Sequence, residues 1–298
     1  PKGEHFILNR EGKLALALFL LAATWWVFEV VPIGVTGITI GVIQALFLIR
    51  PDKITESGEV ISGTWIAFTD FLAPSVWFIL GSLVIGMVFT KTGLTKRLAY
   101  KMLALVGERT SMIYLGVFVM TSALCHIMAH TAVAATIYPL LMAIYALYDE
   151  ENTGQPSKFG KGLFIGMAYV AGAGSIVTLL GAARGAVAIG FFTDIVGREV
   201  TFFELTKYMF LPGWMMTFLL WGFFMIFFKP ERATIPGLRE RAKRLYSRLG
   251  PITRQEILGL TIVLSAVAIM SLRSFIPLLA PVNKSAIILT ATVFFFVF

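Results

Sequence analysis

Two histidines lie inside a long stretch of the chain that contains no Asp, Glu, Lys or Arg. His126 and His130 belong to the segment HIMAHTAVAATIYP, and Thr131 and a run of small residues follow the second histidine. An imidazole can donate a hydrogen bond or take up a proton, and a neighbouring hydroxyl can donate to an anion. This pattern is a candidate binding site, and its meaning depends on the solvent that surrounds it.

A single arginine, Arg184, lies in a second apolar segment, AGAGSIVTLLGAARGAVAIG. Each glycine costs a helix about 1 kcal/mol relative to alanine and can leave carbonyls and amides free to bind ions. The same glycines also suit close packing between helices, so that interpretation stays open. An arginine in such a segment faces a cavity or a partner, or it lies near a helix end and extends to the membrane interface.

The composition identifies the solvent. Hydrophobic residues make up 57% of the 298 residues and charged residues 14%, a balance more apolar than a soluble domain needs. Crossing a hydrocarbon layer of about 30 Å takes roughly 20 helical residues, and the apolar runs here are too long for barrel strands. We predict an all-α polytopic membrane protein in a bacterial inner membrane or plasma membrane, with the lipid bilayer as a partner.

The net charge of +8 comes mainly from two basic loops. Residues 91–109 carry five Lys or Arg against one acid, and residues 229–256 carry eight against three. The positive-inside rule places both loops in the cytoplasm, and this explanation of the charge argues against nucleic-acid binding. The lone Cys125 excludes a disulfide framework or a thiolate cluster, and no nucleophile–base pair or phosphate loop predicts an enzyme.

The order of the apolar runs constrains the topology. The runs cover 14–31, 33–49, 71–90, 110–148, 162–193, 208–228, 257–272 and 285 to the end. Both basic loops lie in the cytoplasm, so the chain between them must cross the membrane an even number of times. Runs 162–193 and 208–228 already give two crossings, so segment 110–148 must cross twice or not at all. As one helix it would reach about 58 Å, so we expect it to fold back near 129–132, either as two full spans or as a re-entrant hairpin.

The same count leaves Pro1 outside the cell, and the last run stops within TATVFFFVF. We therefore expect the 298 residues to be part of a longer protein, with a further helix ahead of Pro1.

Four stretches resemble, in order and spacing, motifs of the divalent-anion/sodium symporter (DASS) family. They are WWVFEVVPIGVTGI, FILGSLVIGMVFTKTGLTKRLAYKML, AHTAVAATIYPLL and AYVAGAGSIVTLLGAARGAVA. An ordered set of motifs is more specific than any single one. The resemblance implies a homodimeric secondary transporter of a dicarboxylate, citrate or sulfate, built from inverted repeats, which carries its substrate by an elevator motion coupled to sodium.

The resemblance also implies an organisation for this chain. Scaffold helices would occupy 1–109, and the transport region 110–228. The transport region would contain the re-entrant hairpin 110–148, the broken helix 162–193 and the helix 208–228. A basic cytoplasmic linker, 229–256, would lead to the start of a truncated second repeat at 257–298.

In the family, the hairpin tip and the broken helix hold a sodium ion and a substrate carboxylate. Carried onto this chain, the substrate-binding residues are His130, Thr131, Thr178 and Arg184, and the ion-binding residues are Ala129, His130, Gly174 and Ser175. This chain departs from the family where Ala129 and His130 replace Ser-Asn and where Ala183, Arg184 and Gly185 replace Pro-Pro-Asn. Since sodium prefers oxygen ligands, we predict an altered first sodium site and no other cofactor.

Our hypothesis is that positive charge from Arg184 and His130 replaces this sodium beside a small anionic substrate. The alternatives are a sodium-independent exchanger or a proton-coupled carrier on the same fold, and, less favoured, a passive anion channel. His130 is open between ligand contact and a structural hydrogen bond of the turn. His126 is expected on the helical leg of the hairpin as a packed, hydrogen-bonded side chain.

Overall fold

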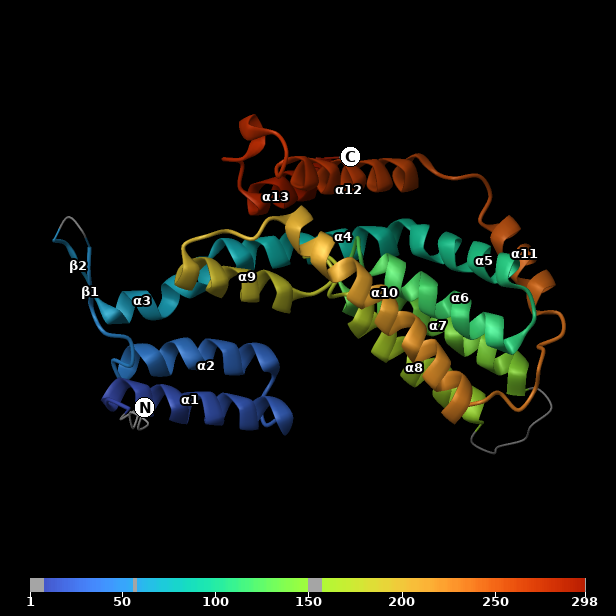
Figure 1. Ribbon diagram of the computed structural model, residues 1–298, viewed down its shortest axis with the longest axis horizontal. Coiled ribbons are helices and arrows are strands. Elements are labelled where there is room, and N and C mark those ends of the chain that lie inside the picture. Colours follow the sequence, from blue (N-terminus) through green and yellow to red (C-terminus); the bar gives the residue numbers. More distant parts are fainter. Residues whose placement is uncertain (1–7, 56–57, 150–156, 298) are drawn as a thin grey trace. The chain divides into compact units, whose positions relative to one another are not determined.

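The computed structural model describes residues 8–55, 58–149 and 157–297, and most of the regular structure in them is helical (Figure 1). The chain forms two compact units, Pro1–Val76 and Trp77–Phe298. Among the described residues, four helical runs are long and apolar enough to cross a membrane: Gly63–Thr92, His130–Asp149, Phe202–Phe227 and Arg254–Leu272. The predicted class of helical membrane protein is therefore confirmed at this level.

The first unit pairs two apolar helices with a short ribbon. Its helices are α1 (Arg10–Val27), α2 (Ile33–Leu46) and α3 (Gly63–Thr69), and the 3-10 turn η1 (Asp70–Leu72) follows. Asn9 starts α1, because its side chain accepts the Gly12 N–H at 2.8 Å. Strands β1 (Lys53–Ile54) and β2 (Val60–Ile61) pair antiparallel. No pattern in the sequence predicted this ribbon, because two-residue strands are too short to show alternation.

The second unit is helical throughout its described regular structure. It contains most of α4 (Pro74–Thr92) and then α5 (Leu94–Val106), α6 (Thr110–Leu124), α7 (His130–Asp149), α8 (Lys158–Gly174), α9 (Ala183–Val196), α10 (Phe202–Phe227), α11 (Leu238–Arg248), α12 (Arg254–Leu272), η2 (Pro277–Leu279) and α13 (Lys284–Val297). Helix α8 packs against α6, α7 and α10 (Figure 1). These helices form the bundle that positions the candidate site.

The basic stretch 91–109, which we predicted to be a loop, contains the helix α5, and the basic stretch 229–256 contains the amphipathic helix α11. In α5, Leu94 and Leu103 are buried while Lys96 and Lys101 are exposed. Helix α11 packs against α5 and is even richer in Arg and Lys. The charges of α5 lower its mean hydropathy, so its narrow buried stripe is visible only in the helical period of its apolar residues.

Aromatic side chains fill the bundle where α8 meets α6. The rings of Tyr114 and Phe118, on α6, are buried, and Tyr114 also stacks against Phe159 of α8 at 5.1 Å between ring centroids. The Tyr114 hydroxyl donates to the Phe159 carbonyl at 2.9 Å. Gly162 and Gly166 face these rings, and a Cβ at either position would overlap the aromatic side chains. Glycine here therefore allows the close packing of two helices.

A buried ion pair joins α5 to the start of α12. The Arg97 guanidinium contacts both carboxylate oxygens of Glu256, at 2.8 and 3.1 Å, and also donates to the Gly250 carbonyl at 2.8 Å. Arg97 is 7% exposed and Glu256 is 2% exposed. The hydrogen bond with Glu256 raises the pKa of Arg97. The pair holds the connection between α11 and α12 against α5.

Removal of one partner of this pair should destabilise the protein strongly. We expect Glu256→Ala to lower the free energy of unfolding by about 3–5 kcal/mol, because it leaves Arg97 buried and unpaired. Unfolding in detergent, followed by circular dichroism, measures the change. Gln255→Ala, at the exposed neighbouring position, is the control. Equal stability of the two variants would contradict this role.

A second carboxylate holds the base of the bundle. Glu231 Oε2 accepts hydrogen bonds from the Tyr148 hydroxyl at 2.8 Å and the Ser157 hydroxyl at 3.1 Å. Its other oxygen accepts the Lys158 N–H. Burial works against ionisation, but these bonds outweigh it and lower the pKa of Glu231 to about 2. The end of α7, the start of α8 and the segment after α10 are thus joined at one group.

The lowered pKa of Glu231 predicts a pH-dependent contribution to stability. An unfolded Glu has a pKa of about 4.3, so the contribution should be complete above that pH and decline as the pH falls toward 2. Glu231 is itself exposed, so solvent screening reduces the effect, and we expect Glu231→Gln to melt slightly below the wild type at pH 7, with a still smaller difference at pH 3.5. Glu240→Gln, which removes an exposed carboxylate, should show no such convergence.

Candidate functional site

The segment 110–148 doubles back as the helices α6 and α7, which lie side by side (Figure 1). Helix α6 ends at Leu124, and α7 begins at His130. The Ala129 carbonyl accepts the Val133 N–H at 3.0 Å, as the first hydrogen bond of α7. The turn therefore occupies 125–129, ahead of the 129–132 that we expected. The alanines after His130 favour helix and bring it into the first turn of α7.

The glycine-rich segment is interrupted between α8 and α9. Helix α8 ends at Gly174, α9 begins at Ala183, and residues 175–182 are not helical. A Cβ on Gly174 would lie 2.6 Å from both the Cα and Oγ of Ser122, so only glycine lets α8 end this close to α6. The Ser175 hydroxyl donates to the Gly172 carbonyl at 2.8 Å and helps to close the last turn.

The hairpin turn and the interruption contact each other directly. The His130 backbone N–H donates to the Gly181 carbonyl at 3.0 Å, and the Thr178 hydroxyl donates to the His126 carbonyl at 2.8 Å. A Cβ on Gly181 would lie 2.5 Å from the Cys125 carbonyl oxygen. Two irregular segments far apart in sequence thus satisfy each other's backbone groups. We call this contact region, residues 125–131 and 172–184, the junction.

The His130 ring is held in one tautomer. Its Nδ1 lies 2.9 Å from the Gly181 carbonyl oxygen. Since a carbonyl only accepts, Nδ1 must carry the hydrogen, and we assign it so from this geometry. The neutral ring then presents Nε2 as an acceptor. Only the protonated ring would present an Nε2–H donor toward an anion.

Arg184 lies in the first turn of α9, and its side chain reaches back to the end of α8. Its Nη2 donates to the Gly172 carbonyl at 3.0 Å and to the Ser175 hydroxyl at 2.8 Å. A cation is stabilised at a helix C-terminus, where the last carbonyls have no helical partner. Arg184 remains exposed, and these bonds use a single nitrogen. Its remaining N–H groups can therefore bind an anion in the fork geometry of a guanidinium.

The structure brings most of the predicted site residues to the junction. Thr131 lies on the exposed surface at the start of α7, whereas Ala129 is buried and supplies no side-chain oxygen. Gly174 and Ser175 end α8. The Thr178 hydroxyl donates its proton to the His126 carbonyl, so it can offer an anion no hydrogen from that group.

The expectation for His126 is wrong in two respects. His126 lies in the turn and not on a helical leg, because α6 ends before it. Its carbonyl, and not its ring, makes the polar contact, and neither ring nitrogen has a hydrogen-bond partner among the described residues. The ring instead packs edge-on against Trp214 of α10, at 5.5 Å between centroids and 89° between planes.

Sequence reasoning missed two buried residues that join α6 to α10 next to the junction. Ser122 of α6 accepts a hydrogen bond from the Thr217 hydroxyl of α10 at 3.1 Å, and both residues are buried. Isolated Ser and Thr residues in apolar helices are a known signal of polar contact between membrane helices. That signal identifies the residues but not their partners.

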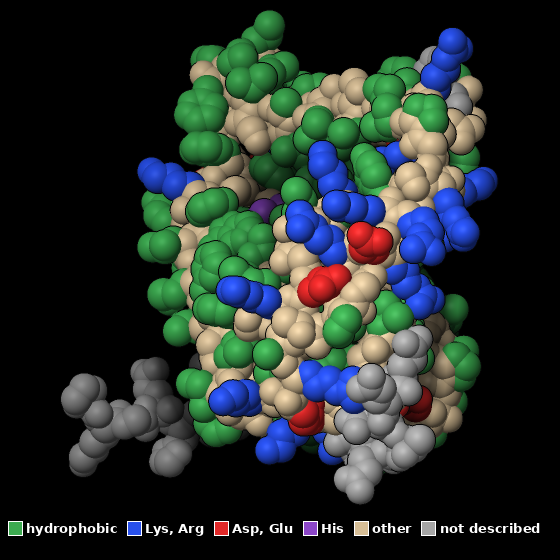
Figure 2. Space-filling model, turned by 90° about the vertical axis from the view of Figure 1, so that its right-hand side faces the viewer, with side chains coloured by type: hydrophobic (Ala, Val, Ile, Leu, Met, Phe, Trp, Pro, Cys, Tyr) green, Lys and Arg blue, Asp and Glu red, His purple; other side chains and the backbone are tan. Residues whose placement is uncertain are grey.

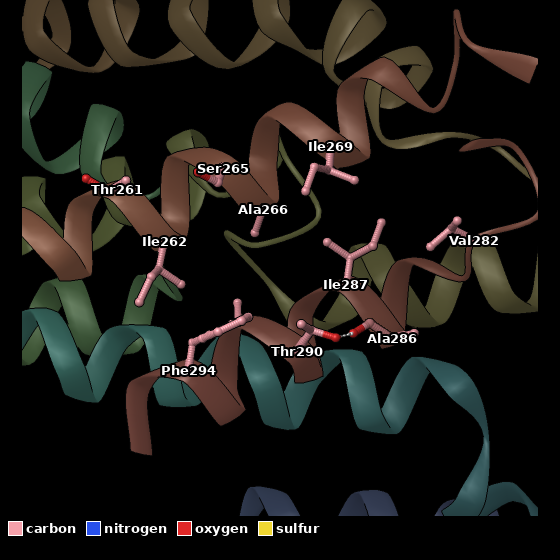
Figure 3. Close-up of a pocket in the computed structure, with 11 residues that line it drawn as sticks. Thr261, Ile262, Ser265, Ala266, Ile269, Val282, Ala286, Ile287, Thr290 and Phe294 are labelled. Carbon is pink, nitrogen blue, oxygen red and sulfur yellow. Dashed lines mark hydrogen bonds between the residues drawn. The ribbon is translucent and has the colours of Figure 1, made fainter. Parts of the chain in front are cut away.

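A groove elsewhere in the second unit lacks the chemistry of an anion site. The groove between α12 and α13 has a volume of about 440 Å³ (Figure 3). Ile262 and Ile269 of α12 point across it toward Ile287 and Phe294 of α13, and none of its lining residues is charged. No group of three or more His, Cys, Asp or Glu placed to hold a metal ion occurs among the described residues.

Apolar helices of membrane-spanning length, packed around a junction of interrupted helices, are typical of polytopic membrane transporters. The family described as sodium:sulfate symporter transmembrane region matches residues 5–298, and the chain belongs to this family.

Curated relatives agree with this assignment. A sodium-dependent dicarboxylate transporter of Staphylococcus saprophyticus is 25% identical over 90% of this chain and 51% of its own length. A sodium-dependent dicarboxylate transporter of Staphylococcus aureus is 27% identical over 89% of this chain and 50% of its own length. The chain thus spans about half the length of these relatives. It is a multi-pass membrane protein of a transporter family, as predicted.

The close approach at Gly181 gives a test of the junction. We expect Gly181→Ala to destabilise the protein by about 1–3 kcal/mol, because the new methyl would overlap backbone atoms of Cys125 and Ser175, which cannot rotate away. Gly172→Ala is the matched control, since its Cβ would meet nothing within 4 Å. Thermal unfolding in detergent measures the change, and equal melting temperatures for both variants and the wild type would show that the junction is not a rigid contact.

Proposed function

We propose that the protein is a secondary active transporter of a small divalent anion, a dicarboxylate, tricarboxylate or sulfate. The family and the names of the relatives support this substrate class. The observation that carries the proposal is the junction itself. It supports the proposal because His130, at the start of α7, contacts Gly181, and Arg184, at the start of α9, contacts Ser175 in the same interruption, and helix N-termini favour anions.

We propose that the first sodium site of this family is altered in this chain. Ala129 offers no side-chain oxygen, and His130 offers nitrogen where sodium prefers oxygen. The Arg184 guanidinium already takes the Gly172 carbonyl and the Ser175 hydroxyl, two oxygens at the end of α8. The residues present do not fit sodium at this position. A fixed guanidinium there supplies the positive charge that a bound cation would otherwise bring to a divalent anion.

Two other coupling modes on the same fold are alternatives to sodium symport. A sodium-independent exchanger needs only the fixed charge of Arg184, whereas a proton-coupled carrier uses the Nε2 of His130, which donates only when the ring is protonated. The relatives are named as sodium-dependent, so sodium coupling is one of the alternatives that the experiment must test.

Proteoliposomes separate these possibilities. Counterflow of a labelled dicarboxylate that persists without sodium indicates exchange, and uptake driven by an inward proton gradient alone indicates proton coupling. Unitary conductance without saturation by substrate would indicate a passive anion channel instead.

We extend the proposal to an elevator motion in a homodimer. The transport region 110–228 would move with the substrate, and the hairpin, the interrupted helix and α10 would travel together. Their mutual packing supports this part of the proposal, since α8 contacts α6, α7 and α10. Helices in 1–109 would form the scaffold, 229–256 the cytoplasmic linker, and 257–298 the start of a second inverted repeat.

The role of Arg184 can be tested by substitution. We expect Arg184→Gln to weaken apparent anion affinity roughly 10- to 100-fold, which is the cost of one hydrogen bond to a charged group. Arg184→Lys should restore part of the affinity, because it keeps the charge but loses the planar fork. Concentration-dependent uptake into proteoliposomes gives both values.

Arg198→Gln is the control for this series, since Arg198 is an exposed arginine paired with Glu204 at the surface. It should leave the affinity unchanged. Wild-type affinity and rate in Arg184→Gln would remove Arg184 from the site, whereas the same loss in both arginine variants would point to a general charge effect.

A further inference from the structure

An apolar groove runs between α5 and α6, away from the junction. It has a volume of about 430 Å³. Its lining is aliphatic and sulfur-bearing: Met102, Leu105, Val106, Met112, Leu115, Gly116, Val119 and Met120. Leu105 is 75% exposed and Met112 is 43% exposed. Aliphatic side chains this open, in the middle of a basic stretch, need an apolar cover.

Two basic residues lie next to the residues that line this groove. The exposed Arg109 lies in the connection between α5 and α6 and immediately precedes α6. Arg239 of α11 donates from Nε to the Ala104 carbonyl at 3.2 Å, beside Leu105. Figure 2 faces this side of the molecule and shows Lys and Arg side chains gathered there around a few acids.

The charge of the surrounding surface is also positive. A neighbouring cleft of about 590 Å³ is lined by Arg241, Arg244 and Arg248, together with Glu108 and Glu240. The Glu108 carboxylate is already engaged, because it accepts the Gly237 N–H at 2.9 Å. The groove therefore combines an apolar slot with a basic mouth, which is the complement of an anionic amphiphile.

We propose that this groove binds one anionic phospholipid of the cytoplasmic leaflet. The phosphate lies between Arg109 and Arg239, and one acyl chain follows α6 from Met112 toward Met120, a length of about 12 Å. The basic stretches of 91–109 and 229–256 put the mouth on the cytoplasmic side, where anionic headgroups lie. This site is separate from the junction and does not depend on which anion is transported.

The lipid site can be tested with the full-length protein in detergent. Native mass spectrometry would count retained phosphatidylglycerol and phosphatidylcholine after titration with each lipid. We expect phosphatidylglycerol to be retained in preference. The double variant Arg109→Gln with Arg239→Gln should bind it roughly 30-fold more weakly, from about 1 kcal/mol for each basic residue near the headgroup. Val119→Trp, which fills the groove, should lose the bound lipid while keeping both arginines.

Lys161→Gln with Arg254→Gln is the charge-matched control, because it removes two exposed basic residues outside the groove. It should bind like the wild type. Unchanged binding in the arginine variant, equal retention of phosphatidylcholine, or unchanged binding in Val119→Trp would each overturn the proposal. The proposal would also fail if the wild type retained no lipid and Val119→Trp changed the oligomeric state. In that case a second copy of the chain would cover the groove.

Discussion

The architecture of the site depends on one constraint, that peptide groups freed from a helix inside a membrane must find partners in the protein. In hydrocarbon an unpaired N–H or C=O costs several kcal/mol, so helix interruptions persist only where they satisfy one another. Here the turn after α6 and the interruption after α8 do this reciprocally, through the His130 N–H with the Gly181 carbonyl and the Thr178 hydroxyl with the His126 carbonyl. Each irregular segment is stable because the other is present.

Electrostatics at the end of α8 follows from the same constraint. The last carbonyls of a helix carry partial negative charge and attract a cation. Arg184 meets that requirement with a covalently attached guanidinium, which also bonds to Ser175. The charge is thus built into the chain and does not depend on an ion from solution. This arrangement explains why an arginine is tolerated within an otherwise apolar segment.

The sequence predicted the helical membrane class, the fold-back of 110–148 and the family, because long apolar runs and ordered motifs are strong signals. It did not place the turn correctly, since the small residues after His130 fit either a tip or a first helical turn. It also could not pair Arg184 with Gly172, or Ser122 with Thr217, because such contacts depend on tertiary packing. Helix α5 was missed because its charges dilute a narrow apolar stripe.

The backbone-to-backbone contact at Gly174 and Gly181 limits how this site can change during evolution. At both positions a single methyl group would collide with main-chain atoms of the opposing segment. The spacing between hairpin and interrupted helix is therefore fixed by the peptide chain and is insensitive to most side-chain replacements nearby. Under the proposed function, new solute preferences would arise at positions 130, 131 and 184, whose side chains are half-buried or exposed and can vary while the frame stays the same.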